Sequence, residues 1–474
     1  MAVDISESPM VLKSGGEFKV IQADLILSNG KVVGLDKSIM GLTIFEGINQ
    51  IALTGNMMIQ DAFNLASFGP IIGQEYLKLK IATPGLQGSA DNSLDYSENA
   101  FMVTSINDRV DIGNGVQASS ISFCSREFIA NQRTRISRKM TGTYSEIVEA
   151  ILRTDLDSTK KFHNEPSVDN KKITVPNITP FDMISIAVKN GISEKYNDPT
   201  YFFWENTRGY NFRTLGHMYS RPPVMNYEYT VPGTRTEDGV KNIMQELSAI
   251  ESYRITGSPD TVYNYTTGIY SSDLIVHDIL YKKHYSYTYN YINNFIDERH
   301  LGENPLVNSL SVTQDGKKVS SFPARQYLKP TVGLGIDESY EDEYNQYSFT
   351  SNRLPPSIQS RNAQLSMLEG GLQMNIDVVG TTAVKAGDIV DIKIPSVAAV
   401  KSSKNEMFDQ LYNGKFLVRT LRHDFDIPNN KHTMSMNVTK DAMNNSLVQS
   451  EENFEPKSDA GAQTISENWN DVLA

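Results

Sequence analysis

The sequence contains a single cysteine, Cys124, among 474 residues. One cysteine can form neither an internal disulfide nor a cysteine-based zinc site, so both kinds of scaffold are excluded. No apolar run approaches the roughly 18 residues that a membrane-spanning helix needs. The first ten residues contain neither a basic region nor an apolar stretch. We therefore expect no membrane anchor and no signal peptide.

The motifs of common enzyme families are also missing. There is no HExxH, GxSxG or GxxxxGK[ST] motif and no glycine-rich strand–turn–helix pattern. The seven histidines are dispersed, and the nearest approach to a metal cluster is His423 with Asp424 and Asp426. Cys124 lies in an alternating apolar stretch, which is typical of a small buried side chain. We predict no catalytic, cofactor-binding or metal-binding residue.

The net charge of −12 is concentrated in two stretches, at 337–343 and in the last segment of the chain. The remainder is close to neutral, which argues against nucleic-acid binding as its main function. Five carboxylates in the seven positions of 337–343 indicate a solvated loop rather than the paired acids of a glycosidase. A basic stretch offers either a phosphate or DNA site or, more commonly, a solvated or subunit-contacting face: Arg126, Arg133, Arg135, Arg138 and Lys139.

Residues 17–138 follow a strand pattern. Asn29-Gly30 separates two apolar runs, which predicts a hairpin with a type I′ turn. Leu77, Leu79 and Ile81 alternate with polar neighbours, as a half-buried strand requires. No helix of crossover length interrupts these strands, so we expect a mostly antiparallel sheet that can close into a barrel.

The next segment has a helical period. Thr143 and Glu146 form a capping-box pattern, and Thr179-Pro180 opens a second helix with proline at its first position. Asn206 to Gly209 lies between two aromatic-rich runs, which predicts a hairpin. These features indicate a small α/β unit.

Strand patterns return beyond residue 240. Four tyrosines, Tyr285, Tyr287, Tyr289 and Tyr291, occupy one strand face; such a face can stack on sugars but is more often packed or subunit-facing. A helix-like stretch ends at Gly370-Gly371, and four more strands are predicted between 372 and 438.

The predicted fold is mainly β with α+β insertions and two antiparallel β-barrels. The expected division has five parts: a barrel at 1–140, a small α/β domain at 141–230, a second, split barrel at 231–295 and 365–441, a loop-rich insertion at 296–364, and an acidic tail at 442–474.

Several ordered motifs resemble the central baseplate hub of contractile-tailed phages, the T-even-type hub family. The resemblance covers about two thirds of the chain. The matching segments are 42–85, which includes Leu53-Thr54-Gly55 and Thr83-Pro84-Gly85, then Arg133 to Ser137, Val175 to Phe181, Val384 to Pro395 and Gly414 to Asp426.

This resemblance implies two tail-tube-like barrels per chain and a homotrimer whose six barrels form a pseudo-sixfold ring. Such a ring joins the sixfold tail tube to the threefold spike. The implied partners are further copies of the chain, the tail spike protein, the tail tube or tube-initiator protein and other baseplate proteins. The implied location is the virion, after assembly in the host cytoplasm, with no cofactor, no enzymatic activity and no sequence-specific nucleic-acid binding.

Two other functions remain open at the level of sequence. A carbohydrate-binding tail adhesin would need exposed aromatic side chains that converge on a groove. A cell-wall glycosidase would need two carboxylates that face each other across a cleft.

Overall fold

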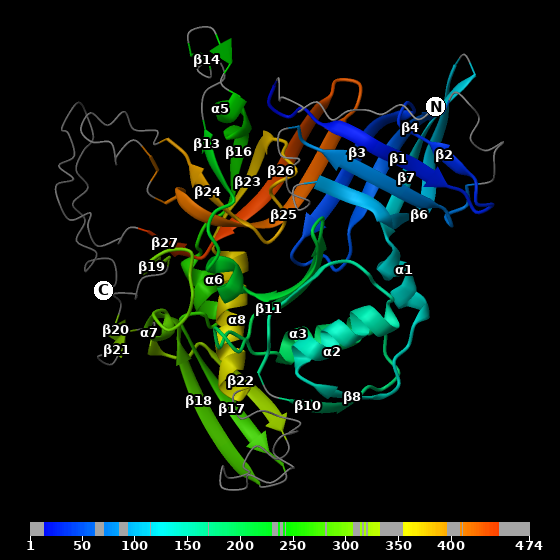
Figure 1. The fold of residues 1–474 in the computed structure, drawn as a ribbon. Helices are drawn as coiled ribbons and strands as arrows, with labels where there is room; N and C mark the ends of the chain where they lie inside the picture. Colours follow the sequence, from blue (N-terminus) through cyan, green and yellow to red (C-terminus); the bar gives the residue numbers. More distant parts are fainter. Residues whose placement is uncertain are drawn as a thin grey trace, which may run out of the picture.

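The computed structural model describes residues 14–61, 71–84, 93–113, 115–168, 170–229, 236–237, 240–241, 243–279, 282–306, 313–314, 317–318, 321–331, 354–395, 408–409 and 411–444. These parts of the chain are mainly β, with short helices between the strands (Figure 1). The acidic run at 337–343 and the part of the predicted tail beyond residue 444 lie outside the described residues. No helix within the described ranges is long and apolar enough to cross a membrane.

The first barrel is an antiparallel sheet that curls around one apolar core. Its strand order is β2-β1-β5-β6-β7-β4-β3. The strands are β1 (Lys19–Ile26), β2 (Val32–Gly34), β3 (Ile39–Gly47), β4 (Thr54–Asp61), β5 (Tyr76–Ala82), β6 (Ser93–Gly113) and β7 (Val116–Ser125). The predicted alternation in β5 is confirmed, because Leu77, Leu79 and Ile81 are all buried in this core.

The predicted hairpin at Asn29-Gly30 is confirmed, because it connects the paired strands β1 and β2. The predicted turn type is wrong. Only Gly30 has a positive φ, of 80°, whereas a type I′ turn requires positive values at two successive residues. The backbone N–H of Gly30 donates to the Leu27 carbonyl, and Asn29 accepts a hydrogen bond from the Lys31 N–H, which holds a longer loop.

The second barrel is closed by hydrogen bonds all the way round. Its order is β25-β24-β13-β16-β23-β26, and β26 pairs back to β25. The strands are β13 (Met225–Tyr229), β16 (Ala249–Gly257), β23 (Leu372–Val379), β24 (Ile389–Lys393), β25 (Gly414–Asp426) and β26 (Lys431–Lys440). β13 runs parallel to both of its neighbours, so this barrel is not purely antiparallel.

Part of the predicted second barrel belongs elsewhere. β17 (Ser271–Asp278) and β18 (Lys283–Asn290) form a separate sheet with β22 (Arg325–Thr331). Leu274 and Val276 of β17 pack with Tyr285, Tyr287 and Tyr327 in a cluster of their own. Assigning all of 231–295 to the barrel is therefore wrong, because an alternating pattern predicts a strand but not the sheet that it joins.

Three further boundaries differ from the prediction. The region 296–364, expected to be loop-rich, contains β22 and the start of α8 (Leu354–Gly370), although the predicted helix end at Gly370 is confirmed. β13 lies in the second barrel although its residues fall within 141–230. β27 (Ala442–Met443) pairs with β19 (Asn304–Pro305), so the predicted tail at 442–474 begins inside the fold.

The α/β segment packs around its own core. The predicted capping box of Thr143 with Glu146 is present at α2, and the predicted helix start at Thr179-Pro180 is confirmed at α3. A second capping box, of Thr179 with Asp182, was not predicted. Its elements are α1 (Arg126–Arg133), β8 (Lys139–Gly142), α2 (Tyr144–Ala150), a π-helical turn (Ile151–Asp155), β9 (Phe162–Asn164), β10 (Lys171–Thr174), α3 (Pro180–Asn190), β11 (Tyr201–Asn206), β12 (Gly209–Thr214) and α4 (Leu215–Tyr219). The predicted hairpin is the β11–β12 pair.

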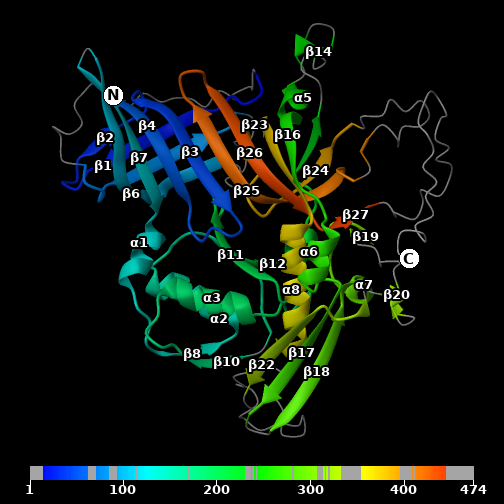
Figure 2. The ribbon, with the colours of Figure 1, turned by 180° about the vertical axis from the view of Figure 1, so that it is seen from behind.

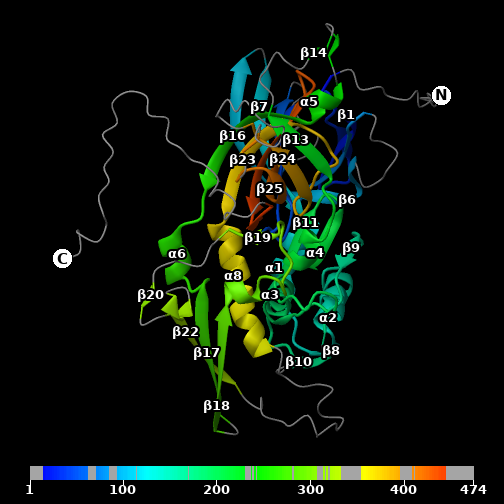
Figure 3. The same ribbon diagram turned by 90° about the vertical axis from the view of Figure 1, so that its left-hand side faces the viewer.

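The two barrels lie side by side, with the α/β segment and the β17–β18–β22 sheet on one side of them (Figures 1 and 2). Helix α8 extends from the second barrel along the β17–β18–β22 sheet, as the side view also shows (Figure 3). The remaining elements are short: α5 (Ile243–Leu247), α6 (Thr261–Thr266), α7 (Tyr291–Asn294), β14 (Thr236–Glu237), β15 (Val240–Lys241), β20 (Thr313–Gln314) and β21 (Lys317–Lys318).

Candidate functional site

The two barrels share one sheet through strand β25. Its residues 414–417 pair with β24 of the second barrel, and residues 420–426 of the same strand pair with β3 of the first. Phe425 accordingly lies in the core of the first barrel, whereas Phe416 lies in the core of the second. A strand that pairs with both barrels fixes their relative position through backbone hydrogen bonds.

Three ionisable side chains lie buried beside this ladder. Glu46 is on β3, and His423 and His432 are on β25 and β26. His423 Nε2 lies 3.7 Å from Glu46 Oε1, and His423 Nδ1 lies 3.0 Å from His432 Nε2. Burial would raise the pKa of Glu46, but His423 and the Lys385 ammonium hold it at about 2. Burial lowers the pKa of both histidines.

The tip of the β11–β12 hairpin docks onto both barrels at this point. Glu46 accepts hydrogen bonds from the backbone N–H groups of Thr207, at the hairpin tip, and Ala386, in the second barrel. Trp204 Nε1 donates to the Ala386 carbonyl over 3.1 Å. Buried polar groups of three chain segments therefore satisfy one another, which stabilises the contact and defines its geometry.

An ion pair extends the same contact. Arg208 Nη1 lies 2.9 Å from both carboxylate oxygens of Asp388, and Arg208 Nη2 donates to the Ala383 carbonyl over 2.6 Å. Arg221 Nη1 lies 3.1 Å from the same carboxylate. Asp388 is 1% exposed, so its charge depends on these two guanidinium groups for compensation.

A second buried charge cluster joins the α/β segment to the first barrel. Lys160 Nζ lies 2.7 Å from both Glu127 Oε2 and Glu205 Oε1. Glu205 Oε2 accepts from the Leu53 N–H, and Glu127 Oε1 accepts from the Ser158 hydroxyl. Burial opposes the charge on Lys160, but the two carboxylates raise its pKa above the usual value.

The chemistry open to these groups is limited by access. Glu127 and Glu205 are at most 1% exposed, and both are held by Lys160. A glycosidase needs two carboxylates that reach a substrate from opposite sides. Within the described residues, no three His, Cys, Asp or Glu side chains come together as metal ligands would. The buried groups are held by one another, which suits a rigid structural joint. This joint consists of Glu46, His423, His432, Trp204, Thr207, Ala386, Arg208, Asp388, Arg221, Lys160, Glu127, Glu205 and Leu53.

Apart from His423, sequence reasoning did not single out the residues of this joint. The available signal was Glu205, a charged residue that follows the apolar run 201–204. In the structure every residue of β11, including Glu205, is buried. A buried charge of this kind implies a partner, but the sequence does not say which one. Glu127, Lys160 and Asp388 were missed for the same reason.

The structure separates the residues of the nearest candidate metal cluster. His423 is buried in the joint, whereas Asp424 accepts a hydrogen bond from Thr43. Asp426 instead accepts from the side chain of Asn429 in the next turn. Cys124 is buried, and burial raises the pKa of its thiol to about 11, which disfavours the reactive thiolate.

The basic stretch is partly neutralised within the chain. Arg138 forms a two-bond pair with Asp155, at 2.6 and 2.7 Å, and Arg126 lies 4.0 Å from Asp157. These contacts favour the interpretation of the stretch as a solvated or subunit-contacting face over a phosphate or DNA site.

The four tyrosines do not form an exposed ladder. Tyr285 and Tyr287 pack against the apolar residues of β17, and Tyr289 and Tyr291 are buried in another core cluster. β18 ends at Asn290, so Tyr291 belongs to α7. Side chains packed in this way do not offer the exposed face that stacking on sugars requires.

No family model matches the chain, and no curated protein matches it in sequence. The chain is similar to solved structures, including a tail protein from Neisseria meningitidis MC58, with 10% identity over 90% of this chain and 97% of that one, at a TM-score of 0.49. The 43 kDa tail protein of prophage MuSo2 from Shewanella oneidensis matches with 10% identity over 90% and 100% of the two chains, at 0.49. The c3393 protein of E. coli, a type VI secretion component described as structurally similar to phage T4 gp27 and gp5, matches with 8% identity over 91% and 80%, at 0.39.

Proposed function

We propose that this chain is a structural hub of the baseplate of a contractile phage tail. The β3–β25 ladder is the observation that carries this function, because it holds two barrels edge to edge within one chain. Three such chains would present six barrels in one ring. A ring of this kind can meet a sixfold tube on one side and a threefold spike on the other.

The buried joint supports this role. Even spacing around a ring requires that the two barrels of each chain keep a fixed offset. The Glu46 contacts and the Arg208–Asp388 pair restrain the barrels and the hairpin between them. Structural adaptation of this kind requires shape and stiffness, and no catalytic side chain.

Ring closure needs a surface that a neighbouring chain can complete. β2 is the free edge of the large sheet in the described part of the chain, and Val32 on it is 62% exposed. An unpaired strand edge favours aggregation in a monomer and is satisfied when a neighbour covers it. We propose that contacts between copies include this edge.

The partners and location follow from the proposed role. We propose contacts with further copies in a homotrimer, with the tail spike protein, with the tail tube or tube-initiator protein and with other baseplate proteins. The proposed location is the virion, after assembly in the host cytoplasm.

Electron cryomicroscopy of tails that contain this chain tests the proposal. We expect three copies in one layer, with their six barrels around the tail axis. Copies at the periphery, or barrels of one chain at different heights, would contradict it. In a parallel assay on purified peptidoglycan we expect no turnover; turnover that one carboxylate-to-amide substitution abolishes would support an enzyme instead.

A further inference from the structure

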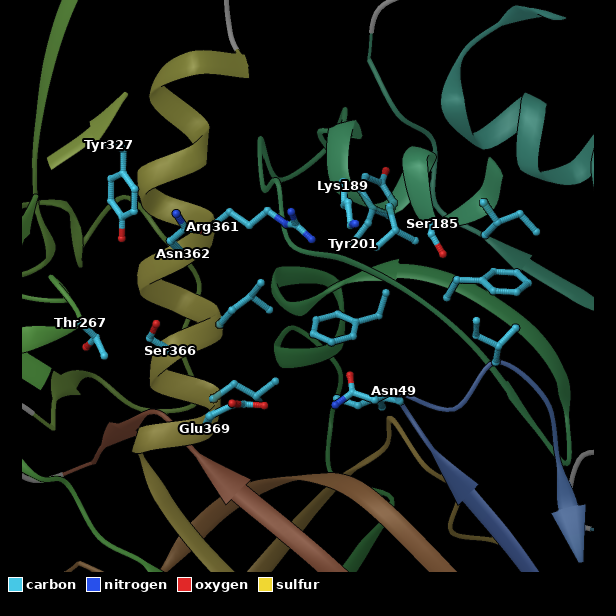
Figure 4. A pocket seen from close by; sticks show the side chains of 18 of the residues that line it. Asn49, Ser185, Lys189, Tyr201, Thr267, Tyr327, Arg361, Asn362, Ser366 and Glu369 are labelled. Carbon is cyan, nitrogen blue, oxygen red and sulfur yellow. The ribbon is translucent and has the colours of Figure 1, made fainter. Parts of the chain in front are cut away.

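A cleft of about 660 Å³ lies where several parts of the fold meet. Residues of α3 and β11 line one side, residues of α8 and β22 line the other, and the loop at 48–51 also contributes (Figure 4). The volume lies within the range of about 300–1,000 Å³ that is typical of ligand-binding clefts. None of the joint residues described above lines it.

The walls of the cleft are largely apolar. They include Ile51, Ile184, Val188, Phe202 and Leu365. Apolar surface in a cleft favours a ligand that brings apolar groups of its own, because both surfaces then leave water.

The charged groups of the cleft are mainly cationic. Arg361 extends from α8 across the cleft toward the side of Lys189 and Tyr201 (Figure 4). Its Nε atom is buried without a hydrogen-bond partner. Among the described residues, Arg361 and Lys189 form no ion pair, and the lining carboxylate of Glu369 already pairs with Arg419 over 2.8 Å.

Burial has an electrostatic consequence for Arg361. Burial lowers the pKa of the guanidinium, and the negative charge of Asp198 opposes this shift. The Asp198 carboxylate itself accepts hydrogen bonds from Thr200 and Gly216. A desolvated cation without a bound acid favours an incoming carboxylate, which would restore hydrogen bonds and compensate the charge.

The cleft also borders a sheet edge. β11 is the terminal strand of the three-stranded sheet β11-β12-β9. At one end of this edge, the Glu205 N–H donates to the Gln50 carbonyl over 3.4 Å. Tyr201, Phe202 and Phe203, further along β11, line the cleft. Every residue of β11 is buried, so the strand contributes apolar wall to the cleft rather than a free edge for strand pairing.

We propose that this cleft binds an extended segment of a partner polypeptide that lies beside β11, places apolar side chains between α3 and α8, and pairs one carboxylate with Arg361. A peptide with apolar and acidic side chains fits better than a phosphate ligand because most of the wall is apolar. The peptide site lies within a single chain. A negative binding result would therefore leave the proposed ring intact, and evidence against the ring would leave the proposed peptide site intact.

A matched pair of peptides tests this site by nuclear magnetic resonance on the full chain with labelled isoleucine methyl groups. The probes are acetyl-Val-Phe-Glu-Val-amide and its counterpart with Gln in place of Glu. We expect the Glu peptide to shift the methyl signals of Ile51 and Ile184, and the Gln peptide to bind at least fivefold more weakly. Arg361→Gln should remove this preference, whereas Arg361→Lys should retain it.

Arg254→Gln is the matched control, because Arg254 is exposed on β16 and does not line the cleft. It should leave the affinity and the preference unchanged. Equal binding of the two peptides, absence of shifts at Ile51 and Ile184, or a preference that persists in Arg361→Gln would overturn the site. If Arg361→Gln does not fold, the two peptides on the unaltered chain decide alone.

Discussion

Lys160 Nζ lies 2.7 Å from Glu205 Oε1 in a place where the lysine side chain is 6% exposed and the glutamate is fully buried. Glu127 shares the same ammonium group at 2.7 Å. The three side chains come from α1, from the segment after the π-helical turn and from β11. All three belong to the α/β segment, and Glu205 links them to the first barrel by accepting a hydrogen bond from the Leu53 N–H.

Replacing this lysine should be costly. Lys160→Met leaves two buried carboxylates uncompensated, and removal of one partner of a buried ion pair typically costs about 3–5 kcal/mol. We expect a clearly lower midpoint in denaturant-induced unfolding, whereas Lys31→Met, at an exposed turn, should be close to neutral. Replacing all three members with apolar residues should recover much of the loss, because no unpaired charge then remains. An unchanged midpoint in Lys160→Met would show that the buried cluster does not stabilise the fold.

The buried histidines predict a loss of stability in mild acid. Burial lowers the pKa of His423 and His432 below the ordinary value of 6.5 in the folded chain, so the unfolded chain binds protons first. The two neutral histidines contribute to the free energy of unfolding above about pH 6.5. This contribution is lost as the pH falls below about 6.5, by at most about 1.4 kcal/mol per pH unit for each proton bound. The Glu46 carboxyl, with a folded pKa of about 2, adds a loss in the same direction below about pH 4.5.

Unfolding midpoints at pH 7.5 and pH 5.5 test this prediction. We expect the difference between them to shrink in His432→Gln, compared with the unaltered chain. The double variant His277→Gln, His284→Gln is the control, because this pair lies at the surface of the β17–β18 hairpin. A pH dependence that is the same in His432→Gln as in the unaltered chain would place the sensitive groups elsewhere.

Gly55 should not tolerate a side chain. A Cβ atom there would lie 2.4 Å from the Phe123 ring and 2.6 Å from the Thr43 carbonyl oxygen. We expect Gly55→Ala to destabilise the first barrel by about 1–3 kcal/mol through overpacking. Gly41 on the adjacent strand β3 is the matched control, since its nearest contact would be 3.8 Å. Equal unfolding midpoints for the two alanine variants would show that the sheet relaxes at Gly55.

The sequence predicted local elements best where short-range physics decides them. The capping box at Thr143, the helix start at Thr179-Pro180, the Asn29-Gly30 hairpin and the alternation in β5 depend on residues close together in the chain. The predicted type of the Asn29-Gly30 turn was wrong because asparagine can adopt the left-handed conformation but does not have to.

Assignments that depend on distant residues were less predictable. β17 has the alternation of a barrel strand, yet it pairs with β18 and β22, and its apolar side chains pack with tyrosines of these two strands. The buried joint could not be predicted for the same reason, since the hydrogen-bond donors to Glu46 are Thr207 and Ala386, which lie far along the chain. Spacing in the sequence carries no information on such pairs.

The mass of the assembled protein in solution tests the central proposal most directly. Light scattering should be measured on the chain alone and on the chain mixed with the spike protein from the same particle. We expect a species of three chains of 53.0 kDa each, formed either alone or on the spike. A single chain in both samples, with no complex at concentrations well above micromolar, would contradict the trimeric hub.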